Sequence, residues 1–433
     1  MSQWVEISYL YLILWYRQED ESVKVLVIGN GGREHAIVDK IIDSPLVTKV
    51  YIAPGNYGIG LQAKQVPIQV HEKEKMVEFA LANGVELAIV GPEASLITGM
   101  ADDLRDAGIK VLGPSKEATM IESSKEYAKK IMEKYCIPTA YYESFTKYEE
   151  ARSYIVKENK YPVVIKYDGL AAGKGVFILG QEKDALEVLD SLLNKKTLGN
   201  DGIIIEEFLD GDEFTVLSLV HGKKVYPFQS ARDFKRIFDN DEGLNTGGMG
   251  AICPYHNIDN KTMDEAISIL QQAAKALVLE ENSFSGVLYG GFIKTKDGVK
   301  VIEFNARFGD PETQCVLNNL ESDLVEHILD LLDNKPVNFA FKDQVSVGLV
   351  LSSPGYPEEY EKNVDLKEYL ELPFKTLHMQ TALIDDKVVS AGGRVLFLLT
   401  AGESSALGYE KLYAQLGKIE NHTLHFRKDL GNY

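Results

Sequence analysis

Hydrophobic and polar positions follow an alternating plan from Val23 onward, in which short apolar runs are separated by amphipathic segments. The runs VKVLVIG, VTKVYIA, VELAIVG and IKVLG have the composition of buried strands. Helices are predicted between them, from about Ala36 to Ile42, near Lys73 to Asn83 and near Met100 to Ala107. Strands that alternate with helices predict a parallel α/β sheet, so residues 23–123 are expected to form an N-terminal α/β domain.

After residue 123 the pattern changes to pairs of apolar runs joined by short turns. A helix is predicted from Lys125 to Tyr135, and PVVIKYDGLAAGKGVFIL then predicts two strands around a glycine loop. A helix from Asp184 to Leu193 precedes GIIIEEFLDGDEFTVLSLV, which again predicts strand, turn and strand. Successive strands joined by short turns indicate an antiparallel α+β domain. We expect it at residues 124–335, with a flap subdomain at about 137–205.

The two ends of the chain complete the predicted organisation. Beyond Pro336, several short strands and a helix from Tyr409 to Leu416 predict a small C-terminal α+β domain at residues 336–433. Residues 1–22 contain the apolar run WVEISYLYLILWY, which is too short to span a bilayer and does not fit a signal peptide. An added strand and a surface appendage are alternatives, but a natural start near Val23 is favoured.

Composition and charge narrow the classes of function. The chain has 433 residues, of which 45% are hydrophobic and 26% charged, so two to four soluble domains are expected. The formal net charge is −19, which argues against a broad nucleic-acid-binding surface and leaves room only for a local basic pocket. The three cysteines are far apart and show no CxxC spacing, so reduced thiols in a cytoplasmic protein are expected.

The segment VKVIEFNARFGDPE, residues 299–312, carries the most informative chemistry. In a strand of period two, Val299, Val301, Glu303 and Asn305 are predicted to share one face. Glu303 and Asn305 then offer a carboxylate and an amide oxygen side by side, which are donors suited to Mg²⁺. Arg307 follows within reach of an anion. A metal–nucleotide site is one interpretation, and a solvated strand end is the other.

Three predicted strands end in loops that contain glycine or proline. Gly29–His35 (GNGGREH) lies at a strand-to-helix turn, where a helix N-terminus favours an anion. It is not the dinucleotide fingerprint GxGxxG, which makes a nicotinamide or flavin cofactor less favoured than a phosphate group. Pro54–Asn56 and Gly91–Glu93 follow other strands of the same sheet, so all three loops are expected on one rim. Ordinary turn chemistry is the alternative for each, and His35 is expected to be a packing residue.

A second set of loops lies in the central region. Gly169–Gly175 resembles a phosphate-binding loop, but Lys174 is followed by glycine and the loop lies between strands. A flap over phosphates, with Lys174 and Lys166 as cations, is favoured over a plain β-hairpin. The acidic run Glu206–Glu213 allows adenine and ribose contacts, although an acidic turn is the commoner explanation of such a run. Three other segments also fit solvated loops: Arg232–Arg236, Asn245–Gly250 and Gly392–Arg394.

Taken together, these segments resemble the ATP-grasp enzymes, and most closely the phosphoribosylamine–glycine ligase family, also called glycinamide ribonucleotide synthetases. The motifs KVLVIGNGGREHA, GPEASL, KYDGLAAGKGV, IIIEEFLDGDE, LNTGGMGA and VIEFNARFGDPETQ occur in the family's order. The resemblance runs from Val23 to the C-terminus, and it implies a parallel N-terminal domain, a central ATP-grasp fold and a small C-terminal α+β domain.

The resemblance implies a reaction as well. ATP would phosphorylate the carboxylate of glycine, and the amine of 5-phospho-β-D-ribosylamine would attack the glycyl phosphate, which yields glycinamide ribonucleotide, ADP and phosphate in de novo purine biosynthesis. ATP and Mg²⁺ (or Mn²⁺) would be required. The protein would be a cytoplasmic monomer without nucleic-acid or membrane partners, in transient contact with the amidotransferase upstream.

Site residues are carried over motif by motif as implications of the resemblance. The catalytic residues would be Arg307, Asp233 and Lys235, and the metal ligands Glu303 and Asn305. The nucleotide would be bound by Lys125, Lys166, Gly173, Lys174, Gly175, Glu206, Glu207, Phe208, Leu209 and Glu213. The substrates would be bound by Gly29, Gly31, Gly32, Arg33, Gly55, Asn56, Pro92, Glu93, Asn245, Gly248, Asp310 and Arg394.

Several positions depart from the family's pattern. Where QDHKR is expected the chain reads RDFKR, so Phe234 replaces an imidazole. Near His378 an HAGTK-like run is replaced by HMQTA, which puts the substrate contacts of the C-terminal domain in doubt. Three alternatives therefore remain: another ATP-grasp ligase of the purine pathway, a catalytically impaired ATP-binding module, and a nicotinamide oxidoreductase, which the missing third glycine opposes.

Overall fold

The computed structural model describes residues 22–171, 175–420 and 422–431. The predicted extension at residues 1–21 and the predicted nucleotide contacts Gly173 and Lys174 therefore lie outside the described residues. Within the described part of the chain, no helix is long and apolar enough to cross a membrane.

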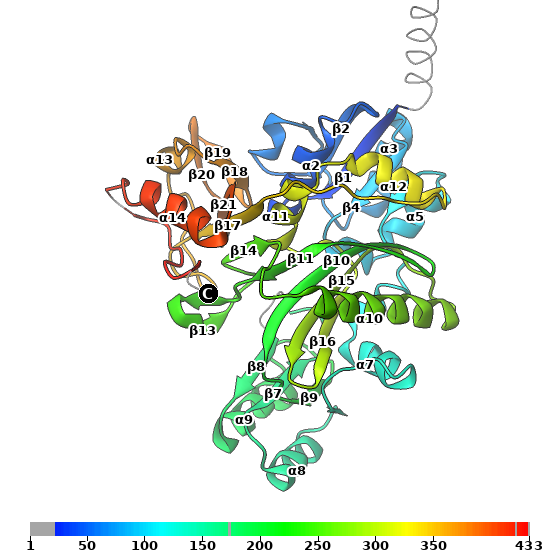
Figure 1. The fold of residues 1–433 in the computed structure, drawn as a ribbon, viewed down its shortest axis with the longest axis vertical. Coiled ribbons are helices and arrows are strands. Elements are labelled where there is room, and N and C mark those ends of the chain that lie inside the picture. Colours follow the sequence, from blue (N-terminus) through cyan, green and yellow to red (C-terminus); the bar gives the residue numbers. More distant parts are fainter. Residues whose placement is uncertain (1–21, 172–174, 421, 432–433) are drawn as a thin grey trace, which may run out of the picture.

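The N-terminal region forms a five-stranded parallel sheet in the order β3-β2-β1-β4-β5, which confirms the predicted parallel arrangement. Its strands are β1 (Val23–Gly29), β2 (Val47–Pro54), β3 (Lys64–Gln65), β4 (Leu87–Val90) and β5 (Lys110–Leu112). Its helices are α2 (Gly32–Ile41), α3 (Lys73–Asn83), α4 (Glu93–Leu96) and α5 (Met100–Asp106) (Figure 1).

Helix α2 begins at Gly32, whereas the apolar pattern predicted a start near Ala36. Its first turn carries the polar side chains of Arg33, Glu34 and His35, all of which are buried. Glu34 Oε2 accepts a hydrogen bond from the Gly31 N–H at 2.7 Å, which satisfies a free donor at the start of the helix. The apolar period detects only the apolar part of a helix, so this turn was missed.

A separate lobe with its own core is formed around a four-stranded antiparallel sheet, in the order β6-β9-β7-β8. Its strands are β6 (Tyr142–Phe145), β7 (Val163–Tyr167), β8 (Val176–Leu179) and β9 (Ile203–Glu207). Helices α8 (Tyr148–Glu158) and α9 (Glu182–Leu189) cover it, and a π-helical turn at Asp190–Asn194 extends α9. The lobe lies at the bottom of Figure 1, away from the N-terminal sheet.

An eight-stranded antiparallel sheet, in the order β16-β15-β10-β11-β14-β17-β21-β18, joins the remaining parts. Its strands are β10 (Asp212–His221), β11 (Lys224–Asp233), β14 (Gly250–Cys253), β15 (Ser285–Thr295), β16 (Gly298–Asn305), β17 (Val345–Ser352), β18 (Lys375–His378) and β21 (Arg394–Gly402). Because β14 pairs with β17, the C-terminal strands extend the central sheet. The antiparallel texture predicted for the centre is confirmed.

The other elements surround this sheet, and in Figure 1 α10 lies along β10, β15 and β16. The helices are α6 (Met120–Ser123), α7 (Lys125–Lys134), α10 (Asn260–Leu279), α11 (Glu312–Asn319), α12 (Leu324–Leu332), α13 (Lys367–Leu370) and α14 (Ser405–Leu416). Two hairpins are formed by β12 (Arg236–Phe238) with β13 (Glu242–Asn245), and by β19 (Thr381–Ile384) with β20 (Lys387–Ser390).

Strand β16 corrects the predicted face of the metal motif. Gly291 on β15 pairs with Glu303 and Phe292 pairs with Val301, so Ile302 is an extra residue without a partner in this ladder. Such a bulge reverses the alternation of side chains. Val299, Val301 and Phe304 therefore share the hydrophobic core, whereas Glu303 and Asn305 border a cavity instead of sharing the face of the valines. The prediction that all four residues share one face is wrong, although Glu303 and Asn305 still lie side by side.

We expect Gly348→Ala to lower the free energy of unfolding by about 1–3 kcal/mol, because overpacking a core costs that much. A Cβ at Gly348 on β17 would lie 1.8 Å from Cζ of the buried Phe397 on β21. Urea unfolding of Gly348→Ala, Phe397→Leu and the double variant measures the coupling, and the smaller leucine should recover part of the loss. Gly180→Ala is the control, since a Cβ there meets nothing within 4 Å. Equal losses of unfolding free energy in Gly348→Ala and Gly180→Ala would contradict this account of the packing between β17 and β21.

Candidate active site

A cavity of about 490 Å³ lies where the N-terminal sheet, the small lobe and the central sheet meet. Fifteen of the residues predicted from the sequence line it: Gly31, Gly32, Arg33, Glu93, Lys125, Lys166, Gly175, Glu206, Asp233, Lys235, Glu303, Asn305, Arg307, Asp310 and Arg394. Those described but not lining it are Gly29, Gly55, Asn56, Pro92, Glu207, Phe208, Leu209, Glu213, Asn245 and Gly248. Residues from helices, strands and loops of the N-terminal domain, the small lobe and the eight-stranded sheet are thus brought to one place.

Glu303 and Asn305 are the candidate metal ligands at the edge of β16. Both border the cavity, and the spacing of two places their oxygens on the same side of the strand. No cluster of three or more His, Cys, Asp or Glu that would hold an ion by itself occurs among the described residues. One carboxylate with one amide oxygen fits Mg²⁺ held jointly by the protein and a phosphorylated ligand, because Mg²⁺ usually keeps only one or two carboxylate ligands.

Arg307 is the central cation of the cavity wall. Its guanidinium pairs with Glu93 on α4, with Nε 3.2 Å from Oε2, and with Glu122 on α6, with Nη2 2.9 Å from Oε1. Burial favours a protonated Glu93, but Arg307 and Arg33 outweigh it and hold its pKa at about 2. Burial raises the pKa of Glu122, which Arg307 only partly opposes. Arg307 therefore joins the N-terminal domain to the end of β16 and remains charged.

A buried triad of charges occupies the side of the cavity next to the small lobe. Glu206 on β9 lies between two lysines, 3.1 Å from Nζ of Lys129 on α7 and 2.8 Å from Nζ of Lys166 on β7. Burial opposes its charge, but the two lysines keep the pKa of Glu206 low, while burial lowers the pKa of Lys129 to about 8. Lys125 completes the group and donates to the Gly169 carbonyl at 3.0 Å. Four side chains that carry charge thus meet here, with a surplus of cations that suits a phosphate.

Another part of the cavity wall holds Asp233, the last residue of β11, and Lys235, two residues further along the chain. Lys235 Nζ lies 3.7 Å from Asp233 Oδ1 and 3.3 Å from Glu213 Oε2. Burial raises the pKa of Asp233, and the nearby Glu213 and Glu303 raise it further against the effect of Lys235. The carboxylates in turn hold the pKa of Lys235 above its usual value despite burial. This pair can therefore bind a polar group that carries both a donor and an acceptor.

Arg394 closes the cavity from the C-terminal part of the chain. Its guanidinium lies 3.3 Å from Asp310 Oδ2 and donates to the carbonyl of Asp310 at 2.9 Å and that of Gly248 at 3.4 Å. The Gly247 N–H in the same loop donates to Tyr356 Oη at 3.0 Å. These contacts hold the loop after β13 and the segment at Asp310 against the C-terminal residues Tyr356 and Arg394, so these parts of the chain together form one wall of the cavity.

Two glycines of the predicted rim accommodate a side chain rather than border the cavity. A Cβ at Gly91 would lie 2.0 Å from Glu34 Oε1, and one at Gly29 would lie 2.5 Å from Glu34 Cδ. Glu34 is buried and forms a 2.6 Å ion pair with Arg33, which does line the cavity. Gly29 and Gly91 therefore act through Glu34, which positions Arg33.

Asn56 is also turned inward. Its Nδ2 lies 2.9 Å from the Asn30 carbonyl and 3.0 Å from the His378 carbonyl, so it joins the N-terminal domain to the C-terminal part. His35 is buried there as predicted for a packing residue and accepts a hydrogen bond from the His378 N–H at 2.8 Å. Burial, together with the neighbouring His378, lowers the pKa of His35 to about 4.

The residues that depart from the family's pattern have different positions. Phe234 belongs to the hydrophobic core of the C-terminal part, 5.5 Å below each guanidinium of Arg232 and Arg427, and does not line the cavity. Met379 and Gln380, from the altered run HMQTA, do line it. The second departure therefore concerns the cavity wall directly, whereas the first acts only through packing.

Sequence reasoning missed several residues of the cavity wall. Glu122, Lys129, Tyr289, Glu312, Tyr356 and Gln380 border the cavity, yet none was singled out. Lys129 had a usable signal, since it lies four residues after Lys125 on the same predicted helix and so on the same face. The others carry no local pattern, because each lies in an element whose role depends on distant partners.

Models of one protein family match nearly the whole described chain. The Phosphoribosylglycinamide synthetase N domain matches residues 23–122, its ATP-grasp (A) domain matches residues 123–313, and its C domain matches residues 346–433. The central fold is accordingly an ATP-grasp fold, as the resemblance implied.

Curated relatives and a solved structure agree. The chain is 45% identical to the phosphoribosylamine–glycine ligase of Caldanaerobacter subterraneus subsp. tengcongensis, over 94% of this chain and 99% of that protein. It is 44% identical to the enzyme of the same name from Halalkalibacterium halodurans, over 95% and 97%. The crystal structure of the Thermotoga maritima phosphoribosylamine–glycine ligase superposes with a TM-score of 0.80 at 29% identity, over 94% of this chain and 100% of that one. A Campylobacter jejuni biotin carboxylase, 15% identical with a TM-score of 0.71, shares the fold, with 94% of each chain covered.

The buried triad predicts a dependence of stability on pH. The pKa of Lys129 is about 8 in the folded protein and 10.5 in the unfolded chain. Between these two pH values the unfolded chain binds more protons than the folded protein, so the free energy of unfolding rises with pH. Between pH 7 and pH 9.5, wild type should gain about 2 kcal/mol of unfolding free energy more than Lys129→Met. Urea unfolding at both pH values measures it. Lys130→Met, next along the helix and largely exposed, should follow wild type; a gain shared by Lys129→Met would count against the assignment.

Proposed function

Since the chain belongs to the phosphoribosylglycinamide synthetase family and catalyses the ATP-dependent ligation of glycine to 5-phosphoribosylamine in purine biosynthesis, we propose that the 490 Å³ cavity is its active site. One observation carries this proposal. Two candidate metal ligands, an arginine and three lysines converge there from three parts of the chain, and this is the set of groups that phosphoryl transfer requires.

The nucleotide lies next to the small lobe in this proposal. Lys125 and Lys166 bind its phosphates, because both ammonium groups border the cavity beside the turn that begins at Gly169. Glu206 holds Lys166 and Lys129 in place, so its carboxylate serves the phosphates indirectly. The Glu207 N–H already donates to the Tyr141 carbonyl at 3.0 Å, so adenine pairs with the backbone from Phe208 onward.

The metal, Mg²⁺ or Mn²⁺, is held by Glu303 and Asn305 in this proposal, because both ions take carboxylate and amide oxygens as ligands. When bound, the ion supplies positive charge to the nucleotide phosphates during transfer. The chain itself contributes Arg307, whose guanidinium borders the cavity and stabilises the negative charge of the transferred phosphoryl group. No side-chain nucleophile is needed, since the carboxylate of glycine attacks the γ-phosphate directly.

The glycine and the amine meet on the side of Asp233, Lys235 and Asp310. A carboxylate becomes a useful acyl donor only after phosphorylation, because phosphate is a far better leaving group than oxide. Lys235 orients the carboxylate of the substrate glycine, and Asp233 accepts a hydrogen bond from the ammonium group of the same glycine. Arg33 and Arg394, with the wall residues Met379 and Gln380, enclose the phosphoribosyl group.

A catalytically impaired module is not favoured. Phe234 lies in the core, with the guanidinium groups of Arg232 and Arg427 each 5.5 Å from its ring centroid, and it does not border the cavity. The loss of an imidazole at this position therefore removes no group from the cavity wall. The proposal also covers where the enzyme works and with which partner. We place it in the cytoplasm as a monomer that receives phosphoribosylamine from the amidotransferase that makes it. Analytical ultracentrifugation of the two proteins together tests the monomeric state and the contact with the amidotransferase.

The function and its metal site are tested by ADP release. Release should require ATP, glycine and freshly prepared phosphoribosylamine together, and Glu303→Gln should lower it by at least about a hundredfold, since metal stabilisation of transition-state charge is worth several kcal/mol. The variant should also need more Mg²⁺ for half-maximal rate. Asp297→Asn, at the exposed turn before β16, is the control with unchanged rate and Mg²⁺ dependence. Full activity of Glu303→Gln would reject the metal site, and release without glycine would reject the ligase reaction.

A further inference from the structure

The ligation releases a proton for which the proposed residues so far provide no acceptor. When the nitrogen of the ribosylamine forms its bond to the carbonyl carbon of glycyl phosphate, the bond from that carbon to the phosphate oxygen breaks. Phosphate leaves with the electron pair, and the new amide nitrogen must lose a proton. A carboxylate close to the reacting nitrogen and free of a cation can accept it.

The carboxylates that border the cavity are Glu93, Glu122, Glu206, Asp233, Glu303, Asp310 and Glu312. Glu93 and Glu122 pair with Arg307, Glu206 with two lysines, Asp233 with Lys235, and Asp310 with Arg394. Glu303 is a proposed metal ligand. Within the described chain, only Glu312 combines a place on the cavity wall with no cation at ion-pair distance and no metal role.

The surroundings of Glu312 suit a proton acceptor. The residue is the first of α11 and is 3% exposed. Its Oε1 lies 3.5 Å from Thr215 Oγ1, which in turn lies 3.0 Å from Tyr289 Oη. A Cβ at Gly309 would lie 2.6 Å from Glu312 Oε2, so the glycine of the sequence FGDPE leaves room for the carboxylate beside the cavity.

We propose that Glu312 accepts the proton of the attacking amine in the ligation step. The carboxylate takes the proton from nitrogen as phosphate departs, and it returns the proton to water or phosphate after the product leaves. The uncharged hydroxyls of Thr215 and Tyr289 hold the carboxylate without neutralising it.

Electrostatics supports this role. Burial and, to a smaller extent, the neighbouring Asp233 raise the pKa of Glu312 to about 7, against the opposing effects of its own backbone N–H, Tyr289 and Lys235. The other titratable or charged groups that face it are Arg307, which is engaged with Glu93 and Glu122, and the buried thiol of Cys315. An acceptor with a pKa near the working pH is the most effective one.

The test separates the two halves of the reaction. Glu312→Gln should lower the single-turnover rate of amide formation by about 10²–10³-fold with little change in the KM for the amine, since general bases contribute 10²–10⁴-fold. Wild type should gain rate as pH rises through about 7, because only the ionised carboxylate accepts a proton, and the variant should lose this limb. Formation of glycyl phosphate, measured as glycyl hydroxamate after trapping with hydroxylamine, should be unchanged in Glu312→Gln.

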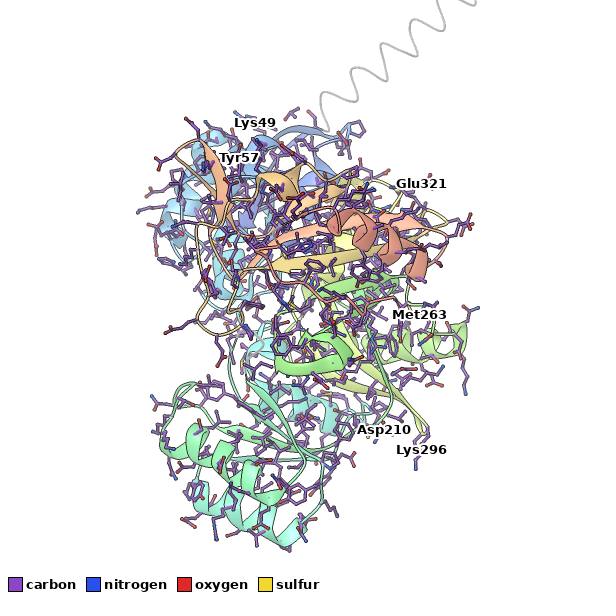
Figure 2. The ribbon with its side chains drawn as sticks, turned by 90° about the vertical axis from the view of Figure 1, so that its left-hand side faces the viewer. Lys49, Tyr57, Asp210, Met263, Lys296 and Glu321 are labelled. Carbon is purple, nitrogen blue, oxygen red and sulfur yellow. The ribbon has the colours of Figure 1, made fainter. Side chains whose placement is uncertain are left out.

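Two further variants keep the test decisive. Glu312→Asp should recover part of the rate and of the pH limb, and Glu321→Gln, on the exposed surface labelled in Figure 2, should behave as wild type. Equal losses of hydroxamate and of amide would mean a structural role and overturn the proposal. A pH limb that survives in Glu312→Gln but disappears in Asp233→Asn would assign the proton to Asp233 instead.

Discussion

The structure depends on the contact of Arg307 with two carboxylates, the half-buried Glu93 and the buried Glu122. Glu93 begins α4 of the N-terminal domain and Glu122 lies on α6, which leads to the central domain, while Arg307 follows β16, an edge strand of the eight-stranded sheet. Removing ionised groups from water costs several kcal/mol each, so such a cluster persists only if each charge meets a partner. Any shift between the two domains would leave a carboxylate unpaired. The cluster thereby holds the domains in register and fixes the guanidinium of Arg307 at the cavity wall.

The same principle divides the remaining charges of the cavity. The triad of Glu206 with Lys129 and Lys166 fixes ammonium groups beside the small lobe, where we propose that the nucleotide binds, and Arg394 pairs with Asp310 where we propose that the substrates bind. Internal pairing makes most of these carboxylates unsuitable for accepting protons, because their charge is already held by a cation. Glu312, which has neutral hydrogen-bond donors but no cation at ion-pair distance among the described residues, is the exception on which our inference rests. The small lobe also meets the central sheet at the turn after β9. This turn lies close to the end of β15, since a Cβ at Gly211 would meet the Lys294 carbonyl, and Figure 2 shows Asp210 and Lys296 near one another at this junction.

Much of the fold could be predicted from local pattern. The parallel N-terminal strands, helix α3 and the antiparallel centre follow from the period of apolar residues, and that period depends only on near neighbours. The start of α2 could not be found in this way, because its first turn carries the polar side chains of Arg33, Glu34 and His35, and these are buried only by contacts made in the folded protein. The face of Val299 and Val301 was predicted wrongly, because a bulge at Ile302 is set by pairing with β15 and has no local signature. Many candidate site residues were found because motifs mark glycines, lysines and carboxylates. Glu122 lies in no such motif, and nothing within the motif VIEFNARFGDPETQ distinguishes Glu312 as a residue of the cavity wall.

By itself the sequence determined which chemistry is present: an oxygen pair for Mg²⁺, an arginine next to it, lysines for phosphate, and a family order of motifs. These are properties of residue type and spacing, and they survive without coordinates. Only the tertiary structure decided which charges are paired and which remain available, since partners such as Arg307 and Glu93 are far apart in the chain. It also decided that Gly29 and Gly91 make room for Glu34 and that Phe234 belongs to the core. The physical reason is that burial and ion pairing are properties of contacts, and contacts between distant segments exist only once the chain has folded.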